Sequence, residues 1–390
     1  MRRHLLLTVC GVGLIAGAQG AMAQSCEIKI GGMGPMSGGA AQWGLAMSGA
    51  AELAAAEVNA EGGLKMGDKK CKVIVVPYDS KYTADGAAAG ANALAAQGIK
   101  IIVGPVGSPE ATGIKPVAAR NEQLTWNAAY AKNALEPKYP LAFHVAPAPA
   151  VWADPMIKKA LQVFPMKSVA LVAPNDQAGT DIVAVDAEAY RANGIKTTEE
   201  YYQRGTTNFA PIVTRILAAK PDVVDTASSP PGDAGVIVKQ LRLAGFTGPI
   251  GRLGGPGTEE IIRVAGGIDV LKDFFWYETV ATGDPKVQEI DALYRKFLGK
   301  EPVGGTALWG NLPAARMTLK AISAAGTADD ANKVAAAMRL LPVEDPNMGK
   351  GHWTGKKQYG IAQELHFPYG FGVIKDGKNL GVTRMEAKPD

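Results

Sequence analysis

Short runs of β-branched and apolar residues alternate with longer, alanine-rich helical stretches along almost the whole 390-residue chain. Strand-like runs at 27–33, 72–79, 99–103 and 123–127 are each followed by a helical stretch or a turn, and the pattern starts again after Pro147. Such alternation predicts parallel sheets covered by helices on both faces. Because the pattern runs twice, we expect an α/β protein with two doubly wound parallel-sheet lobes rather than one wide sheet, which also suits the length.

The last third of the chain has too few strand-like runs to form a third domain. It contains one strand-like run at 274–280, helical stretches between 286 and 341, and a final strand-like stretch at 363–374. These pieces are expected to complete the two lobes by crossing between them near Pro147, Val280 and Gly351, which gives a hinge of three segments. The predicted domains are a leader at 1–23, an N-terminal lobe at 24–146 plus 280–350, and a C-terminal lobe at 147–279 plus 351–390.

The first 23 residues have the pattern of a secretory leader. A basic start with Arg2 and Arg3 precedes an apolar run at 5–16, and an A-x-A cleavage pattern ends at Ala23. The apolar run is too short to span a bilayer. We therefore expect cleavage after Ala23 and export; a buried N-terminal helix is the alternative, and the arginine pair leaves the twin-arginine route open.

Cleavage would remove Cys10 and leave Cys26 and Cys71. An even pair of cysteines in an oxidising compartment favours a disulfide. Both residues directly precede strand-like runs, so the sulfurs meet if these strands lie side by side and parallel. Two unpaired buried thiols are the alternative.

Charge and motifs exclude several classes of function. The formal net charge of +4 falls to +2 once Arg2 and Arg3 leave with the leader. The sequence has no run of basic residues, which argues against binding to nucleic acid or to an anionic membrane. The histidines lack metal-ligand spacing, so neither a metal nor a cofactor is expected. A dinucleotide-binding fingerprint is disfavoured because Ser37 stands at its third glycine position. His144 and Asp176 lack a nucleophile between them, and no hydrolase motif occurs, which argues against an enzyme.

Glycine-rich loops follow the first and third strands of the first lobe, GGMGPMSG at 31–38 and GPVGSPE at 104–110. In parallel sheets, ligands bind beyond the carboxyl ends of the strands. Glycines let a ligand approach the backbone, and a helix N-terminus favours an anion. The second loop places Ser108 as a helix cap before Pro109. A carboxylate is therefore the expected guest, and the alternative is that Ser108 only caps its own helix.

Aromatic residues are scarce, at 7% of the chain, so their positions carry weight. Trp43, Trp126, Tyr130 and Trp152 all lie near the expected cleft. Four aromatic residues at one sheet edge favour walls for an apolar or flat ligand, and ordinary core packing is the alternative.

The order and spacing of several segments resemble the periplasmic binding proteins of the branched-chain-amino-acid type, which serve ABC transporters and have a type I periplasmic binding fold. These segments run across nearly the whole exported chain: GPMSG at 34–38 with Trp43, VNAEGGL at 58–64, GPVGS at 104–108, GTTNFAP at 205–211 and KPDVV at 220–224. The resemblance implies a monomeric, non-enzymatic protein in the periplasm, with a small-molecule carboxylate and a membrane permease as partners.

The resemblance also implies which residues touch the ligand. Trp43 would wall the pocket, while Ser108 and nearby amides hold the carboxylate. The full predicted set is Ser37, Trp43, Val106, Gly107, Ser108, Trp126, Ala128, Ala129, Tyr130, Trp152, Asn175, Ala178, Ser228, Gly255 and Thr258.

Two departures from the family pattern bear on the ligand. Ala178 stands where the family has an aromatic residue, and the glutamate that binds the amino group is missing after Gly255-Pro256. Glu259 or Asp233 would be the substitutes. Because a buried ammonium without a carboxylate is costly, we expect a carboxylate ligand without a free α-amino group, such as an aromatic acid, with branched-chain amino acids as the close alternative. A ligand sensor that feeds a regulator, and an exported hydrolase of amides or esters, are the alternative functions.

Overall fold

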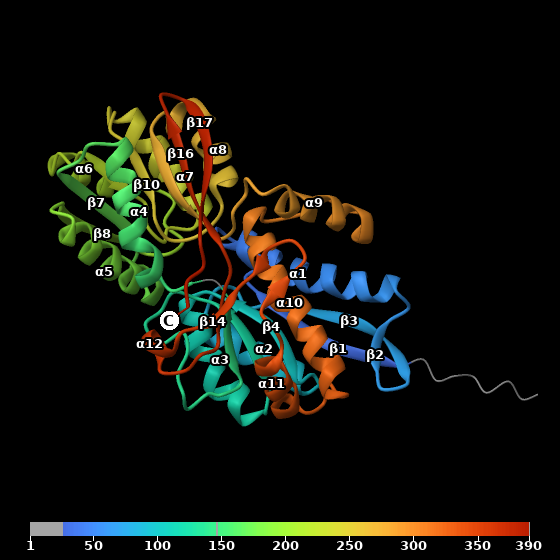
Figure 1. Cartoon of the computed structure of the whole chain (residues 1–390). Helices are drawn as coiled ribbons and strands as arrows, with labels where there is room; N and C mark the ends of the chain where they lie inside the picture. The colour runs from blue at the N-terminus through green and yellow to red at the C-terminus, as the bar shows by residue number, and fades with distance from the viewer. Residues whose placement is uncertain (1–25, 146, 390) are drawn as a thin grey trace, which may run out of the picture.

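Two sheets in which most strand pairs are parallel form the frame of the molecule, one in each lobe (Figure 1). The computed structural model describes residues 26–145 and 147–389, so the predicted leader and its cleavage site at Ala23 lie outside the described residues. Within those ranges, no helix combines the length and the apolar character that a membrane crossing requires.

The first sheet has eight strands in the order β14-β15-β6-β5-β4-β1-β3-β2, and its edge pairs β14–β15 and β3–β2 are antiparallel. Its strands are β1 (Glu27–Gly34), β2 (Leu64–Met66), β3 (Lys69–Asp79), β4 (Ile101–Val106), β5 (Leu124–Ala128), β6 (Ala142–Val145), β14 (His352–Thr354) and β15 (Glu364–His366). The helices of this lobe are α1 (Ala41–Ala60), α2 (Ala84–Ala95), α3 (Ser108–Arg120), α9 (Pro285–Leu298), α10 (Thr306–Ala325), α11 (Ala331–Leu340) and α12 (Lys356–Tyr359). A small hairpin pairs β12 (Glu344–Asp345) with β13 (Gly349–Lys350).

The second sheet has seven strands in the order β17-β16-β11-β10-β9-β7-β8. Its strands are β7 (Ser168–Pro174), β8 (Lys196–Tyr202), β9 (Val223–Asp225), β10 (Ile250–Arg252), β11 (Phe274–Glu278), β16 (Tyr369–Lys375) and β17 (Lys378–Met385). The helices are α4 (Pro149–Val163), α5 (Gln177–Ala192), α6 (Ala210–Ala218), α7 (Pro231–Leu243) and α8 (Thr258–Ala265), with a short 3-10 turn, η1 (Ile268–Leu271). The prediction of two doubly wound lobes is confirmed.

Apolar side chains cover both faces of each sheet, which is why the strands read as continuous apolar runs. In the first lobe, α1, α10 and α11 pack on one face around Ile30 and Leu312, and α2 and α3 pack on the other around Leu94 and Ile114. In the second lobe, α4 and α5 cover one face, and α6, α7 and α8 cover the other.

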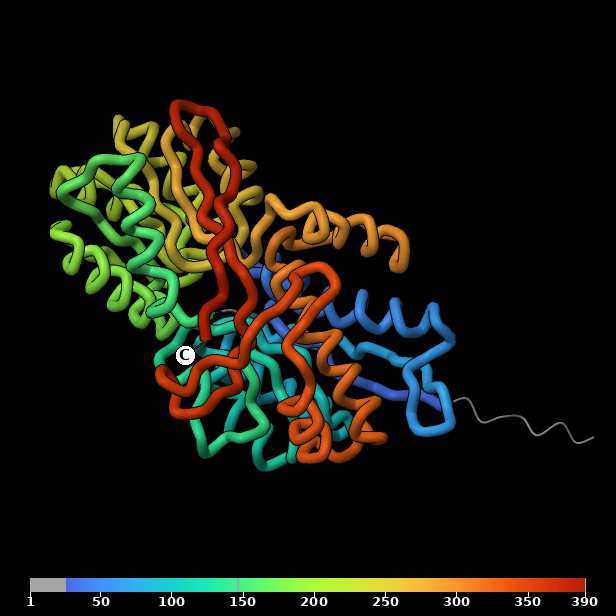
Figure 2. The backbone as a smooth tube through the Cα atoms, viewed as in Figure 1, coloured from blue at the N-terminus to red at the C-terminus, as the bar shows by residue number. Residues whose placement is uncertain are grey.

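The chain crosses between the lobes at three places, and one of them differs from the prediction. The first two follow β6 and β11, near Pro147 and Val280 as expected. The third was predicted near Gly351, with 351–390 in the C-terminal lobe. Instead β14 and β15 join the first sheet, and the crossing falls between His366 and Tyr369, as the smooth tube in Figure 2 traces. The predicted single strand at 363–374 is therefore two strands in two sheets, separated at Pro368, which has no N–H to donate to a ladder.

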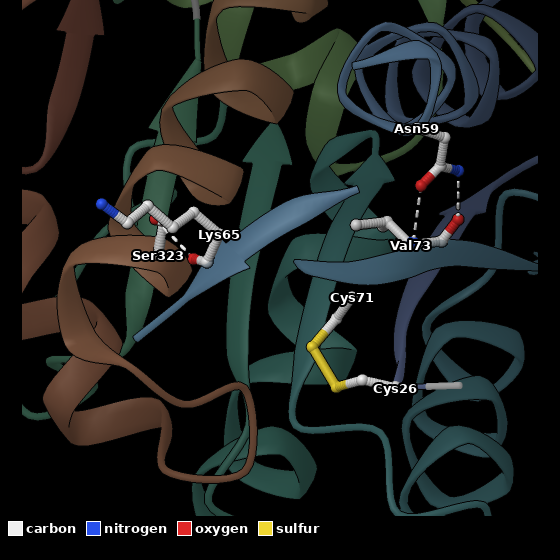
Figure 3. The surroundings of a disulfide bond; sticks show 6 residues. All are labelled: Cys26, Asn59, Lys65, Cys71, Val73 and Ser323. Carbon is white, nitrogen blue, oxygen red and sulfur yellow. Dashed lines mark hydrogen bonds between the residues drawn. A yellow bond between two sulfur atoms is a disulfide. The ribbon is translucent and has the colours of Figure 1, made fainter. Parts of the chain in front are cut away.

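The predicted disulfide between Cys26 and Cys71 is present (Figure 3), with the two Cα atoms 4.5 Å apart. Strands β1 and β3 are parallel neighbours, with Glu27 opposite Lys72. The cysteines that precede these two positions are thereby brought to the same end of the sheet, as the sequence predicted.

Candidate functional site

A cavity lies between the two lobes, with lining residues from the ends of β4 and β5, from the loops of the second lobe and from the hinge. It encloses about 850 Å³ of space not filled by atoms, a figure that includes open solvent at its mouth. Of the described residues that line it, none is Asp, Glu, Lys, Arg or His. The described part of the chain also holds no group of three His, Cys, Asp or Glu residues that could hold a metal ion.

The structure brings most of the predicted site residues to this cavity. Those that line it are Trp43, Val106, Gly107, Ser108, Ala128, Ala129, Tyr130, Ala178, Ser228 and Gly255. They come from both lobes, so a ligand in the cavity would touch each lobe.

Ser108 does not have the capping role that the sequence suggested. Helix α3 begins at Ser108 itself, and Gly107 is the residue at the cap position, with φ +115°. A Cβ on Gly107 would lie 2.5 Å from the Tyr82 ring, so only glycine fits there. The Ser108 hydroxyl is buried and has no hydrogen-bond partner among the described residues. A donor and a helix N-terminus therefore face the cavity together, an arrangement suited to a carboxylate.

Glu110 lies on the first turn of α3, close to this anion-favouring end. Its side chain is fully buried, and Ser80 donates a hydrogen bond to one of its oxygens. Burial raises the pKa of the Glu110 carboxyl to about 8. At neutral pH the group is therefore mostly protonated and places little negative charge beside Ser108.

Aromatic rings form part of the cavity wall. The Trp43 indole N–H donates to the carbonyl of Pro256 at 3.2 Å and so links the two lobes. Its ring lies 6.0 Å from that of Tyr82. Tyr130 meets the ring of Trp152 edge-on at 6.0 Å. These contacts hold flat surfaces in place for an apolar or aromatic ligand.

Five predicted site residues lie outside the cavity lining. Ser37 donates to Asp79 at 3.0 Å in an exposed loop, and Asn175 is exposed at the end of β7. Trp126 is fully buried in the first-lobe core, where its N–H donates to Thr318.

The other two support the cavity from behind. Trp152 is fully buried against Tyr130, and its N–H donates to the carbonyl of Pro147 at 3.1 Å. Thr258 begins α8 and is buried. The sequence pattern could not show which face of an element each of these side chains occupies.

The lining residues that the sequence missed come mainly from the hinge and from distant segments. They are Tyr82, Val145, Pro147, Ile182, Gly254, Pro256, Thr279, Val280, Ala307, Gly310, Asn311, Pro313, Met348, Leu365 and Phe367. Pro147 and Val280 were predicted as places where the chain crosses between the lobes. Because a ligand between the lobes must lie near these crossings, the sequence could have indicated both residues as part of the site. The start of α10 gave no comparable signal in the sequence.

The backbone excludes a glutamate at the position after Gly255-Pro256. Gly257 has φ +117°, and a Cβ there would lie 2.3 Å from the Pro231 ring. Neither predicted substitute lines the cavity. Asp233 accepts a hydrogen bond from Tyr202 at 3.1 Å, and Glu259 lies on the first turn of α8. No carboxylate among the described lining residues is therefore placed to pair with an ammonium group.

Two contacts join the lobes at the start of α5. Thr112 of the first lobe donates to Gln177 of the second at 2.8 Å. The Arg204 guanidinium, paired with Asp176 at 2.5 Å, stacks 4.0 Å from the centre of the Tyr82 ring across the cleft. The structure therefore has its lobes closed over the cavity.

This fold and cavity define a two-lobed binding protein whose cavity is formed jointly by both lobes. The family described as periplasmic binding protein matches residues 27–365, and the chain belongs to that family. The predicted family resemblance is confirmed.

Known proteins of this type cover most of the chain. The Leu/Ile/Val-binding protein BraC3 of Rhizobium johnstonii is 29% identical over 331 residues, which are 84% of this chain and 87% of that protein. The Leu/Ile/Val-binding protein of Citrobacter freundii is 28% identical over 88% of this chain and 91% of its own.

Solved structures share the fold at lower sequence identity. A leucine-binding protein from Thermotoga maritima has a TM-score of 0.76 at 20% identity, with 92% of this chain and 99% of that chain covered. A solute-binding protein of an R. palustris ABC transporter, solved in complex with benzoate, has a TM-score of 0.75 at 20% identity, with 93% and 97% covered.

Proposed function

We propose that this protein captures a small carboxylate that lacks an α-amino group, with an apolar or aromatic body, between its two lobes. The proposal depends on the polar groups of the cavity wall. Among the described residues, no acidic side chain lines the cavity, and the buried hydroxyl of Ser108 has no hydrogen-bond partner. Leaving an ammonium group there unpaired costs several kcal/mol. The carboxylate, in contrast, gains a hydrogen bond and the favourable end of α3.

The aromatic wall supports an apolar or flat ligand body. Trp43, Tyr82 and Tyr130 line the cavity, and Glu110, on the first turn of α3, is held mostly protonated by burial. Among proteins of similar fold, one was solved with isoleucine and another with benzoate. The cavity of this chain suits the second chemistry better, because benzoate has a carboxylate and no ammonium.

The proposed role is capture followed by delivery. A ligand that touches both lobes favours the closed form and is hidden from water. Export through the leader at 1–23 would place the protein in the periplasm, and an ABC transporter permease would receive the ligand from the closed form. The names of the relatives, which include transporter substrate-binding proteins, support this role.

A melting experiment on ligand-stripped protein tests the proposal. Benzoate should raise the melting temperature in a concentration-dependent way, because a ligand that binds only the folded state stabilises it. Leucine at the same concentrations should not, and benzoate should be recovered unchanged from the mixture. A rise with leucine and none with any aryl carboxylate would contradict the proposal and favour an amino-acid ligand.

A further inference from the structure

The guanidinium of Arg252 lies behind the second-lobe wall of the cavity, and two of its three nitrogen atoms have no hydrogen-bond acceptor among the described residues. Arg252 ends β10, and its side chain is fully buried. Its Nη1 donates to the carbonyl of Ala227, but Nε and Nη2 have no partner among the described residues. Buried guanidinium donors without acceptors are costly, so the N–H groups on these two nitrogen atoms destabilise the protein unless a ligand accepts from them.

The buried carboxylate of Asp225, which interacts electrostatically with Arg252, does not satisfy these donors. Asp225 accepts hydrogen bonds from the Tyr190 hydroxyl at 2.8 Å and from the backbone N–H groups of Ala227 at 2.8 Å and Leu253 at 3.1 Å. Across the described ranges, no salt bridge within 4.0 Å joins Arg252 to a carboxylate. Burial lowers the pKa of Arg252 to about 10, which still leaves the group positively charged at neutral pH.

The free Nη2 is buried close to Gly255, a residue that lines the cavity. A Cβ placed on Gly255 would lie 3.8 Å from Arg252 Nη2, 3.8 Å from the Trp43 ring and 3.9 Å from the Tyr130 ring. Gly255, Trp43 and Tyr130 all line the cavity. The point where a side chain of residue 255 would begin is therefore within van der Waals distance of two aromatic rings and of an unsatisfied cationic donor.

We infer that Arg252 is a specificity-determining residue that hydrogen-bonds an oxygen acceptor on the ligand, at the end away from the carboxylate held near Ser108. This inference rests on the proposed function and deepens it: the ligand is an acid with a second oxygen group, either a carboxylate or a hydroxyl. A guanidinium only donates hydrogen bonds, so an ammonium group at that end is rejected. Arg252 belongs to the second lobe, the lobe in which the family resemblance places an amino-group-binding glutamate.

Calorimetric titration of the unaltered protein tests this with five probes: benzoate, 3-hydroxybenzoate, 4-hydroxybenzoate, benzene-1,4-dicarboxylate and 4-(aminomethyl)benzoate. At least one of the two hydroxybenzoates and the dicarboxylate should bind roughly ten- to hundredfold tighter than benzoate, as a charge-assisted hydrogen bond implies. The cationic 4-(aminomethyl)benzoate should bind more weakly than benzoate. The dicarboxylate and the hydroxy acids separate a charged acceptor from a neutral one.

A matched pair of variants assigns the effect to Arg252. Arg252→Met should reduce the affinity ratio between the tightest-binding acid with a second oxygen group and benzoate to about threefold or less. Arg242→Met should leave this ratio unchanged, because Arg242 donates to the backbone carbonyls of Val270, Phe246 and Gly248 away from the cavity. Should Arg252→Met fail to fold, the ligand series on the unaltered protein still decides.

The outcomes separate the two proposals. If benzoate binds and no oxygen substituent improves it, or if the cationic acid binds equally well, the role of Arg252 is overturned while the proposed function stands. If no aryl carboxylate binds, the proposed function fails and the role of Arg252 fails with it.

Discussion

Replacement of Ser108 by alanine is expected to weaken carboxylate binding roughly ten- to hundredfold, because a hydrogen bond to a charged group contributes about 1.5–3 kcal/mol. The folded protein should be unaffected, since the hydroxyl makes no hydrogen bond to any described residue. Calorimetry with the tightest-binding probe measures the affinity, and the melting temperature without ligand measures the fold.

Ser48 provides a matched control for Ser108. Its hydroxyl is also buried and without a partner among the described residues, but it lies in α1 and does not line the cavity. Ser48→Ala should keep the affinity of the unaltered protein. Equal affinities for the Ser108 and Ser48 variants would remove Ser108 from the binding site.

Replacement of both Cys26 and Cys71 by alanine should lower the free energy of unfolding of the first lobe by about 4 kcal/mol on the chain-entropy account of disulfides. The bridge closes a loop with a sequence separation of 45, which includes β1, α1 and β2. For a lobe of this size, such a loss corresponds to a fall in melting temperature of roughly 8–16 °C. Scanning calorimetry, which resolves the two lobes if they melt separately, measures it.

Reduction of the unaltered protein with dithiothreitol under the same conditions is the control for the disulfide variant. It should reproduce the loss, because it opens the same loop without changing the packing of the buried Cys71 side chain. A fall of less than about 2 °C in both experiments would mean that the bridge does not stabilise the fold in the way that loop closure requires.

The fold was largely predictable because its signals are local. Strand β1 extends one residue beyond the predicted run at 27–33, and α9 begins one residue before the helical region predicted from 286. The third chain crossing was not predictable in this way. Residues 363–374 form one apolar stretch in the sequence, but the sheet that each half joins depends on partners such as β6 and β11 that are distant in the chain.

The candidate site was predictable where a loop follows a parallel strand. Gly107 and Ser108 follow β4, and Ala129 follows β5, so the sheet itself brings them to the cavity. Trp126 lies on β5 two positions before the lining residue Ala128, but the sequence does not show whether its ring points into the cavity or into the core. In the structure the ring is in the core, where its N–H donates to Thr318 of α10. The hydroxyl of Ser108 and the donors of Arg252 became visible as unsatisfied groups only in three dimensions.

The cavity is expected to hold a carboxylate and to reject an α-ammonium group. Calorimetry with phenylalanine and 3-phenylpropanoate tests it most directly, since the two differ only in that ammonium group. We expect 3-phenylpropanoate to bind roughly a hundredfold tighter or more, because phenylalanine would bury its ammonium without a carboxylate partner. Phenylalanine binding as tightly as its deaminated analogue, or more tightly, would contradict the claim.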